Sequence, residues 1–306
     1  MNFIKKSLVV LSLILAVFAQ DSLVASEILS PQIKIKVIAE KLIFTEGPLW
    51  LDDKQSLIFS DVRGNKQYIW SEKNGLKVFR DPSDFSNGNM LDSDGNIITA
   101  QHNRTVTKTL KNGKRVVIAS HFNKKKFNSP NDLALYKDAS IYFTDPPFGL
   151  RGTNKKEEQE HRGIYRLTKK GKITRVGQEL GIPNGLAFSP DFTKLYVTNS
   201  VDGHIYLYDV TKNGNLKNLR LFVTQFAPKG KKAIGDGIKV DKKGNIWAAS
   251  FLGVSVYSSK GIHLGDIKLE KPGSNLTFGA SEKILFITSR DKVYKVDNLK
   301  LKKTSK

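Results

Sequence analysis

The sequence has 306 residues, 39% of them hydrophobic and 26% charged, and this ordinary globular composition excludes a disordered, collagen-like or coiled-coil chain. It contains no cysteine, which excludes a disulfide framework, a thiolate nucleophile, a zinc finger and an iron–sulfur cluster. Fifty Lys and Arg residues outnumber the 29 Asp and Glu residues, which gives the chain a formal net charge of +21 at pH 7.

The first 25 residues have the layout of a secretory signal peptide. Lys5 and Lys6 precede an apolar run, and small residues follow it, as in exported proteins. We expect cleavage after Ala19 or Ala25, and export of residues 26–306 to a periplasm or to the outside of the cell. An uncleaved membrane anchor is the alternative, but the run is shorter than the roughly twenty apolar residues that span a bilayer. We therefore expect no membrane association once the signal is removed.

An early strand at residues 33–43 and six later segments show how the rest of the chain is organised. The early strand has no hairpin partner of its own. Each later segment is a short β-branched or aromatic strand after a polar turn, and successive segments start 39 to 54 residues apart. They begin at Leu57, Ile97, Ile141, Leu195, Ile246 and Leu285. Asp-Gly and Lys-Gly pairs between them are typical of hairpin turns.

A repeat of this length with about four strands is typical of a β-propeller blade. Such sheets bury both faces only when they stack around an axis. We therefore predict an all-β fold, a six-bladed β-propeller of four-stranded antiparallel blades formed by residues 26–306 as one domain. The strand at 33–43 is expected to complete the last blade and close the ring. A two-sheet sandwich is the alternative.

An acid or amide side chain lies ten or eleven residues before each repeated strand. These ring positions are Glu46, Asn87, Asn131, Asn184, Asp236 and Asn275. Equivalent positions of successive blades encircle the axis, so their oxygen atoms are predicted to converge. Carboxylate and amide oxygens suit Ca²⁺, with Mg²⁺, Mn²⁺ and Zn²⁺ as alternatives. Asn-Gly and Asp-Gly pairs also form turns without a metal, but Glu46 is a poor turn residue.

Five ordered motifs resemble the gluconolactonase/regucalcin-like (SMP-30/gluconolactonase/LRE) family. They are FTEGPLW (44–50), NSPNDLAL (128–135), YFTDPPFGL (142–150), IPNGLAFSPD (182–191) and GDGIKVDKKGNIW (235–247). The Pro-Pro-Phe-Gly segment at 146–149 is similar to the bacterial gluconolactonase branch. The resemblance runs from about Phe44 to Ser289. It implies a six-bladed propeller with one divalent ion, usually calcium, and lactone hydrolysis as the activity.

The resemblance also implies roles for individual residues. Glu46, Asn184 and Asp236 match the metal ligands, and Asn131 matches an asparagine that faces both ion and substrate. Asp236 matches the residue that acts as general base. Some animal members place an arginine two residues before the matching asparagine, where this chain has Ser129, and this departure leaves the sugar specificity open.

Two further side chains are candidate substrate contacts. Asn87 is expected to hold a ring or hydroxyl oxygen of the substrate. His102 follows a repeated strand, which would place it at the channel mouth, although a lone histidine is more often a structural hydrogen-bond donor. A serine-hydrolase Gly-x-Ser-x-Gly motif is absent from the sequence, so nucleophilic serine chemistry is unsupported.

These patterns predict an exported, metal-dependent hydrolase that acts on a small-molecule lactone. Nucleic acid is not expected as a partner, because the basic residues are scattered over turns and the C-terminal tail without interleaved aromatic residues. We expect a monomer or a small homo-oligomer. A phosphotriesterase or arylesterase with the same metal site and a non-enzymatic ligand-binding propeller remain alternatives.

Overall fold

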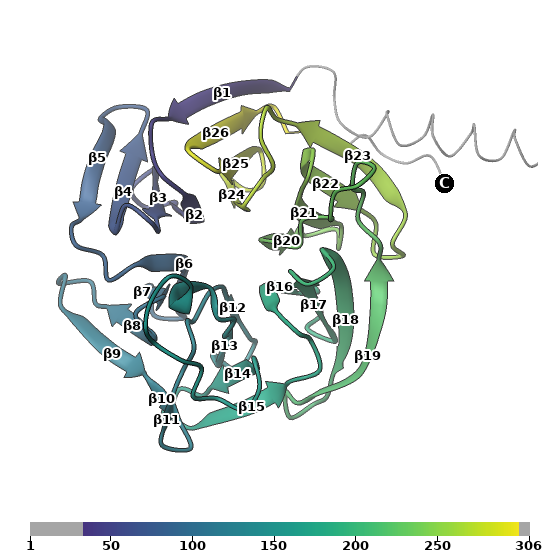
Figure 1. The fold of residues 1–306 in the computed structure, drawn as a ribbon. Coiled ribbons are helices and arrows are strands. Elements are labelled where there is room, and N and C mark those ends of the chain that lie inside the picture. Colours follow the sequence, from purple (N-terminus) through teal and green to yellow (C-terminus); the bar gives the residue numbers. More distant parts are fainter. Residues whose placement is uncertain (1–32, 300–306) are drawn as a thin grey trace, which may run out of the picture.

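The six repeated segments form the second strands of six four-stranded antiparallel sheets. The computed structural model describes residues 33–299, in which the sheets surround one axis as blades (Figure 1). This confirms the predicted fold class. The predicted signal, residues 1–25 with cleavage after Ala19 or Ala25, lies outside the described residues. Within 33–299, no helix has the length and apolar character needed to cross a membrane.

The first five blades run from an innermost strand to an outer strand in chain order. The first two blades are β2 (Thr45–Leu51), β3 (Ser56–Asp61), β4 (Lys66–Ser71) and β5 (Gly75–Arg80), then β6 (Ser86–Leu91), β7 (Ile97–Gln101), β8 (Thr105–Thr109) and β9 (Arg115–Ala119). The third contains β12 (Leu133–Leu135), β13 (Ile141–Thr144), β14 (Ile164–Leu167) and β15 (Ile173–Gly177). The fourth contains β16 (Pro183–Phe188), β17 (Lys194–Asn199), β18 (His204–Val210) and β19 (Leu216–Val223). The fifth contains β20 (Ile238–Val240), β21 (Ile246–Ser250), β22 (Gly253–Tyr257) and β23 (His263–Lys268).

The sixth blade joins the two ends of the described chain. It contains β24 (Asn275–Gly279), β25 (Ile284–Ser289), β26 (Lys292–Asp297) and, as its outer strand, β1 (Lys34–Ala39). Strand β1 pairs antiparallel with β26, with Lys34 opposite Asp297. The closure predicted from the sequence is therefore confirmed, although the closing strand is shorter than expected. A small hairpin, β10 (His121–Phe122) with β11 (Lys125–Lys126), and the 3₁₀ turn η1 (Phe148–Leu150) lie outside the six blade sheets.

The hydrophobic core lies between neighbouring blades. One cluster joins Phe59 and Trp70 of the first blade to Phe286 and Val293 of the sixth. Trp50 stacks on Phe286 with their ring centroids 4.9 Å apart. Since each sheet covers the apolar faces of its neighbours, removal of water from these faces favours the closed ring.

Glycine lets the innermost strands approach one another closely. Four of the six ring positions are followed by glycine. A Cβ atom on Gly185 would lie 2.5 Å from the Asp236 carbonyl oxygen and 2.8 Å from Gly237 Cα. These neighbours are backbone atoms of the next blade, so no flexible side chain could move aside. The glycines therefore bring the ring positions close to the axis.

We expect Gly185→Ala to lower the free energy of unfolding by about 3 kcal/mol, the upper part of the range for overpacking a rigid site. Gly171→Ala is the control, because Gly171 has a positive φ of 83° but open space around its Cβ position, and backbone strain alone costs about 1 kcal/mol. Denaturant unfolding of both variants measures the difference. An equal or smaller loss at Gly185 would contradict the close-packing argument.

Candidate active site

The six ring positions lie at the starts of the innermost strands. Glu46, Asn87 and Asn184 are the second residues of β2, β6 and β16, and Asn275 is the first residue of β24. Asn131 and Asp236 lie just before β12 and β20, with one residue between each and its strand. Glu46, Asn87, Asn131, Asn184 and Asn275 are each at most 5% exposed, and Asp236 is mostly buried. The structure therefore places all six predicted residues around one axis.

Hydroxyl groups from the repeated strands hold the backbone of ring residues on the next blade. The donor–acceptor pairs are Ser60 Oγ to the Asn87 carbonyl (2.8 Å), Thr144 Oγ1 to the Asn184 carbonyl (2.7 Å) and Thr198 Oγ1 to the Asp236 carbonyl (2.6 Å). Each donor is the fourth residue of its repeated segment. Each bond joins two neighbouring blades, so it fixes the position of a ring residue along the axis relative to the previous blade.

The carboxyl group of Glu46 is buried and accepts two hydrogen bonds. Its Oε2 accepts from the Gly47 backbone amide at 3.0 Å and from Asn275 Nδ2 at 3.1 Å. Burial raises the pKa of Glu46 well above its ordinary value, and the nearby Asp236 carboxylate raises it further. The two hydrogen bonds oppose that rise but do not cancel it.

Asp236 is in contact with two other predicted ligands. Burial raises the pKa of Asp236 to about 7, while hydrogen bonds with Asn184 and Glu46 and the charge of Arg290 act in the opposite direction. The structure thus brings Glu46, Asn184 and Asp236 together. Two ionised carboxylates this close repel each other, so the contact requires a shared proton or a cation. Their roles as metal ligands stay predictions.

Asn87 and His102 form a pair on the second blade. Asn87 Nδ2 and His102 Nε2 are 2.9 Å apart, and burial lowers the pKa of His102 to about 4. The imidazole is therefore neutral at pH 7, so its Nε2 can accept this hydrogen bond. Asn87 Oδ1 is then left buried without a partner within the described chain. An unpaired buried oxygen is costly, and a ligand hydroxyl or a cation would satisfy it.

Asn131 is held through its backbone. Its N–H donates to the Thr144 carbonyl at 2.9 Å, and its carbonyl accepts from Gly88 N at 2.8 Å. Two residues earlier, Ser129 is fully buried. Its hydroxyl donates to the Pro146 carbonyl and accepts from Gly149 N at 2.9 Å. Ser129 therefore fastens the loop that carries Asn131, and its side chain is not free to contact a substrate.

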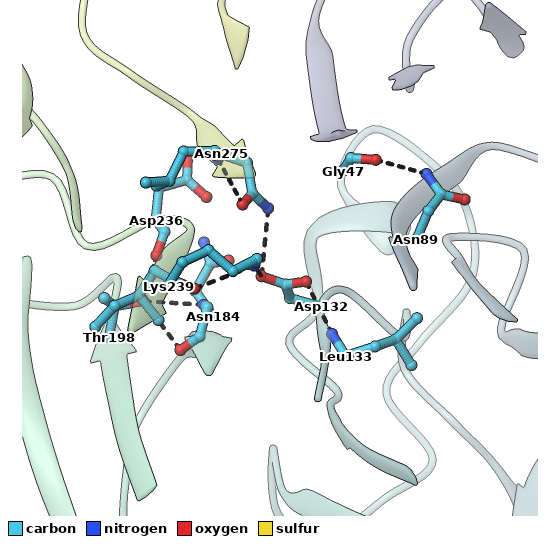
Figure 2. Close-up of polar contacts among 12 residues, drawn as sticks. Gly47, Asn89, Asp132, Leu133, Asn184, Thr198, Asp236, Lys239 and Asn275 are labelled. Atoms are coloured by element: carbon cyan, nitrogen blue, oxygen red, sulfur yellow. Dashed lines mark hydrogen bonds and ion pairs between the residues drawn. The ribbon is translucent and has the colours of Figure 1, made fainter. Parts of the chain in front are cut away.

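Two charged residues of the channel, Asp132 and Lys239, were not predicted from the sequence. Asp132 is 3% exposed, and its Oδ2 lies 3.7 Å from Lys239 Nζ (Figure 2). Two signals were present in the sequence. Four ring positions are followed by glycine, whereas Asn131 is followed by Asp132. In five of the six repeats, the residue three positions after the ring position is apolar. In the repeat of Asp236, this residue is Lys239.

A separate cavity of about 360 Å³ lies beside the later parts of β12, β16 and β20. Its walls include Leu186, Phe188 and Phe192, and Lys239 also lines it. None of the six ring residues does. The cavity is therefore distinct from the ring site, and the Lys239 side chain extends from it to Asp132.

The donor set fits a hard divalent cation better than a soft one. Within residues 33–299, no group of three or more His, Cys, Asp or Glu side chains could hold a metal ion. The ring instead offers two carboxyls in contact and neighbouring amide groups, one of which has an unpaired buried oxygen. Oxygen donors of this kind suit Ca²⁺ or Mg²⁺.

Residues 44–291 match the family described as SMP-30/Gluconolactonase/LRE-like region. The chain belongs to this family. A gluconolactonase from Zymomonas mobilis is 34% identical to it over 293 residues, covering 88% of this chain and 82% of that protein. The solved structure of a gluconolactonase from Xanthomonas campestris is 32% identical, with a TM-score of 0.82 over 90% of this chain and 92% of that one.

A more distant member has the same architecture. The structure of regucalcin from Agrobacterium tumefaciens, described as a calcium-binding protein, matches with a TM-score of 0.72 over 88% of this chain and 95% of that chain. Its sequence identity is 18%, so this likeness shows the fold alone. The SMP-30/gluconolactonase/LRE-like family predicted from the five motifs is confirmed.

The raised pKa of Asp236 predicts how this family member's stability depends on pH without metal. A carboxyl whose pKa is about 7 in the folded state and about 3.9 in the unfolded state destabilises the fold as pH rises between these values. In chelator-treated protein at pH 8, Asp236→Asn should therefore have a free energy of unfolding above that of the wild type by on the order of 2 kcal/mol, and a higher unfolding temperature. Near pH 4 the difference should shrink.

Asp209→Asn is the control of opposite sign. Hydrogen bonds from Lys194 and Arg220 lower the pKa of Asp209, so this substitution should lower the unfolding temperature at pH 8. Thermal unfolding followed by circular dichroism at the two pH values gives the comparison. A metal-free Asp236→Asn protein less stable than the wild type at pH 8 would show that Asp236 is not strained by burial.

Proposed function

We propose that this protein is an exported, metal-dependent lactonase that hydrolyses a sugar lactone or a related lactone. It would act as a hydrolase of carboxylic esters, with Asp236 as general base. The contact of Glu46, Asn184 and Asp236 carries this proposal, because it joins two carboxyls and an amide at one point of a gluconolactonase-family chain. The proposed export rests on the N-terminal sequence alone.

Glu46, Asn184 and Asp236, together with Asn131, would hold one divalent cation, for which we propose calcium. Hard oxygen donors and buried negative charge support this choice over zinc. The chemistry that such a cation would supply there is polarisation of the lactone carbonyl and stabilisation of the negative charge that develops on its oxygen.

Asp236 takes a proton from the attacking water. It must be ionised to do so, and a neighbouring positive charge favours the ionised form. A basic group with a proton affinity near neutral pH suits general-base catalysis. Asn87 and Asn131 hold substrate oxygens, and neutral His102 keeps the Asn87 amide nitrogen turned toward the imidazole. As the bond between the carbonyl carbon and the ring oxygen breaks, Asp236 returns this proton to the ring oxygen, and the resulting hydroxy acid leaves as its carboxylate anion after it loses the carboxyl proton to water.

Asp236→Asn should lower kcat for the best lactone by about 10³-fold, within the range for loss of a general base, while the circular dichroism spectrum stays unchanged. The assays should compare glucono-, galactono- and simple aliphatic lactones with a phosphotriester and an aryl ester. Asp53→Asn, at an exposed turn position, is the control and should keep full activity. Near-normal turnover by Asp236→Asn would remove its assigned role, and faster hydrolysis of the phosphotriester would favour the phosphotriesterase alternative.

Chelator treatment should inactivate the protein reversibly, and added calcium should restore activity. Glu46→Gln removes one ligand charge, so we expect the Kd for calcium to rise about tenfold or more, because ligand charge sets affinity at such sites. Isothermal titration calorimetry on chelator-stripped protein measures this Kd. Glu72→Gln, at an exposed side chain, is the control. A calcium affinity that does not change in Glu46→Gln would count against the proposed cage.

A further inference from the structure

The channel contains a third buried carboxylate that the proposed reaction does not use. Asp132 Oδ1 accepts from the Leu133 backbone amide at 2.8 Å, and its Oδ2 accepts from Asn275 Nδ2 at 3.3 Å. Figure 2 shows that the side chains of Asn275 and Lys239 both reach the same oxygen, Oδ2, of Asp132. A buried carboxylate is stable only when it is hydrogen-bonded and its charge is compensated.

One amide group connects Asp132 to Glu46. Asn275 Nδ2 donates to Glu46 Oε2 at 3.1 Å as well as to Asp132. Its Oδ1 accepts from the Leu276 backbone amide at 2.8 Å, and this bond fixes which end of the amide faces the carboxylates. Asn275 therefore couples the orientation of Glu46 to the position of Asp132.

Lys239 supplies the positive charge next to Asp132. Its Nζ is 3.7 Å from Asp132 Oδ2 and 3.1 Å from the Ile238 carbonyl, to which it donates. The equivalent side chains three residues beyond the other ring positions are Leu49, Met90, Ala134, Ala187 and Phe278. Of these, the small side chains of Ala134 and Ala187 line the same cavity as Lys239. Lys239 is thus a single cationic side chain at an otherwise apolar level of the channel.

The charges of Asp132 and Lys239 belong to the same group as those of the proposed metal site. The carboxyls of Glu46, Asp132 and Asp236 are neighbours: one amide nitrogen of Asn275 bridges the first two, and Asp236 is hydrogen-bonded with Glu46. One divalent cation and one ammonium group together match three carboxylates. Arg290 also acts on Asp236, but it is exposed, so solvent screens its charge.

We propose that Lys239 is a built-in counter-charge for Asp132, which limits the channel to one divalent cation and, through Asn275, positions Glu46 as a ligand. Asp132 and Lys239 are then positioning residues that set cation affinity and stoichiometry without contacting the substrate. This inference rests on the proposed metal site.

Calcium titrations of four chelator-stripped, full-length proteins test it. Asp132→Asn removes the carboxylate that compensates the Lys239 ammonium group, so a positive charge is left near the bound calcium ion. Calcium affinity should therefore fall about tenfold, as expected for a unit charge a few ångströms away in a partly shielded site. Lys239→Met leaves the Asp132 carboxylate uncompensated, so affinity should rise by about the same factor, or the stoichiometry should rise from one ion to two. The double variant should return to within about threefold of the wild type, because the two changes cancel.

Controls separate charge from packing. Lys239→Arg keeps the charge and should keep the wild-type affinity, which also tests the position should Lys239→Met not fold. Lys242→Met removes an exposed lysine that lines the same cavity and should change nothing. If both single variants weaken calcium binding, or neither changes it, Lys239 is a structural residue only and the proposal is overturned. A wild type that binds no calcium would overturn the proposed metal site, and this inference with it.

Discussion

The site depends on the contact between the Glu46 and Asp236 carboxyls at the innermost strands of the propeller. Burial raises the pKa of both groups, so the folded chain holds them together against their preference for water and against their mutual repulsion when ionised. Such an arrangement persists only if the rest of the structure is rigid enough to keep the groups from moving apart. A positive charge between the two carboxylates would relieve their repulsion, and the proposed metal-dependent reaction relies on this.

The propeller supplies this rigidity through contacts between neighbouring blades. Apolar clusters between the sheets and the pairing of β1 with β26 close the ring. Near the axis, backbone of one blade lies against glycine of the previous one, as Asp236 does against Gly185. Hydroxyl groups such as Thr198 Oγ1 then hold the carbonyls of the ring residues. Residues far apart in the chain, such as Glu46 and Asp236, are thereby fixed in one small volume.

The repeat spacing and the acid or amide residue before each repeated strand were enough to predict the fold and the six ring positions. A period tells which residues face the axis, since equivalent residues of each blade occupy equivalent places. It does not tell how deep a side chain reaches or which neighbour it meets. The pairing of Asn87 with His102 and of Asp132 with Lys239 depends on such depths. The sequence signal for the pairing of Asp132 with Lys239 is an exception within the repeat, since Lys239 stands where the other repeats have an apolar residue.

The structure holds two ring residues and the loop before Asn131 in different ways. The backbone atoms of Asn184 and Asp236 are held by hydroxyl donors of the repeated strands, so these positions tolerate little movement. The loop before Asn131 is different, because Ser129 uses its hydroxyl to fasten the loop to Pro146 and Gly149. No side chain at position 129 is then left to grip a sugar hydroxyl, as an arginine there would. In the proposed lactonase, substrate selection would therefore fall to the remaining amides and to the segments around the channel mouth. Since those segments lie outside the blade sheets, they can change between family members without disturbing the contact of Glu46 with Asp236.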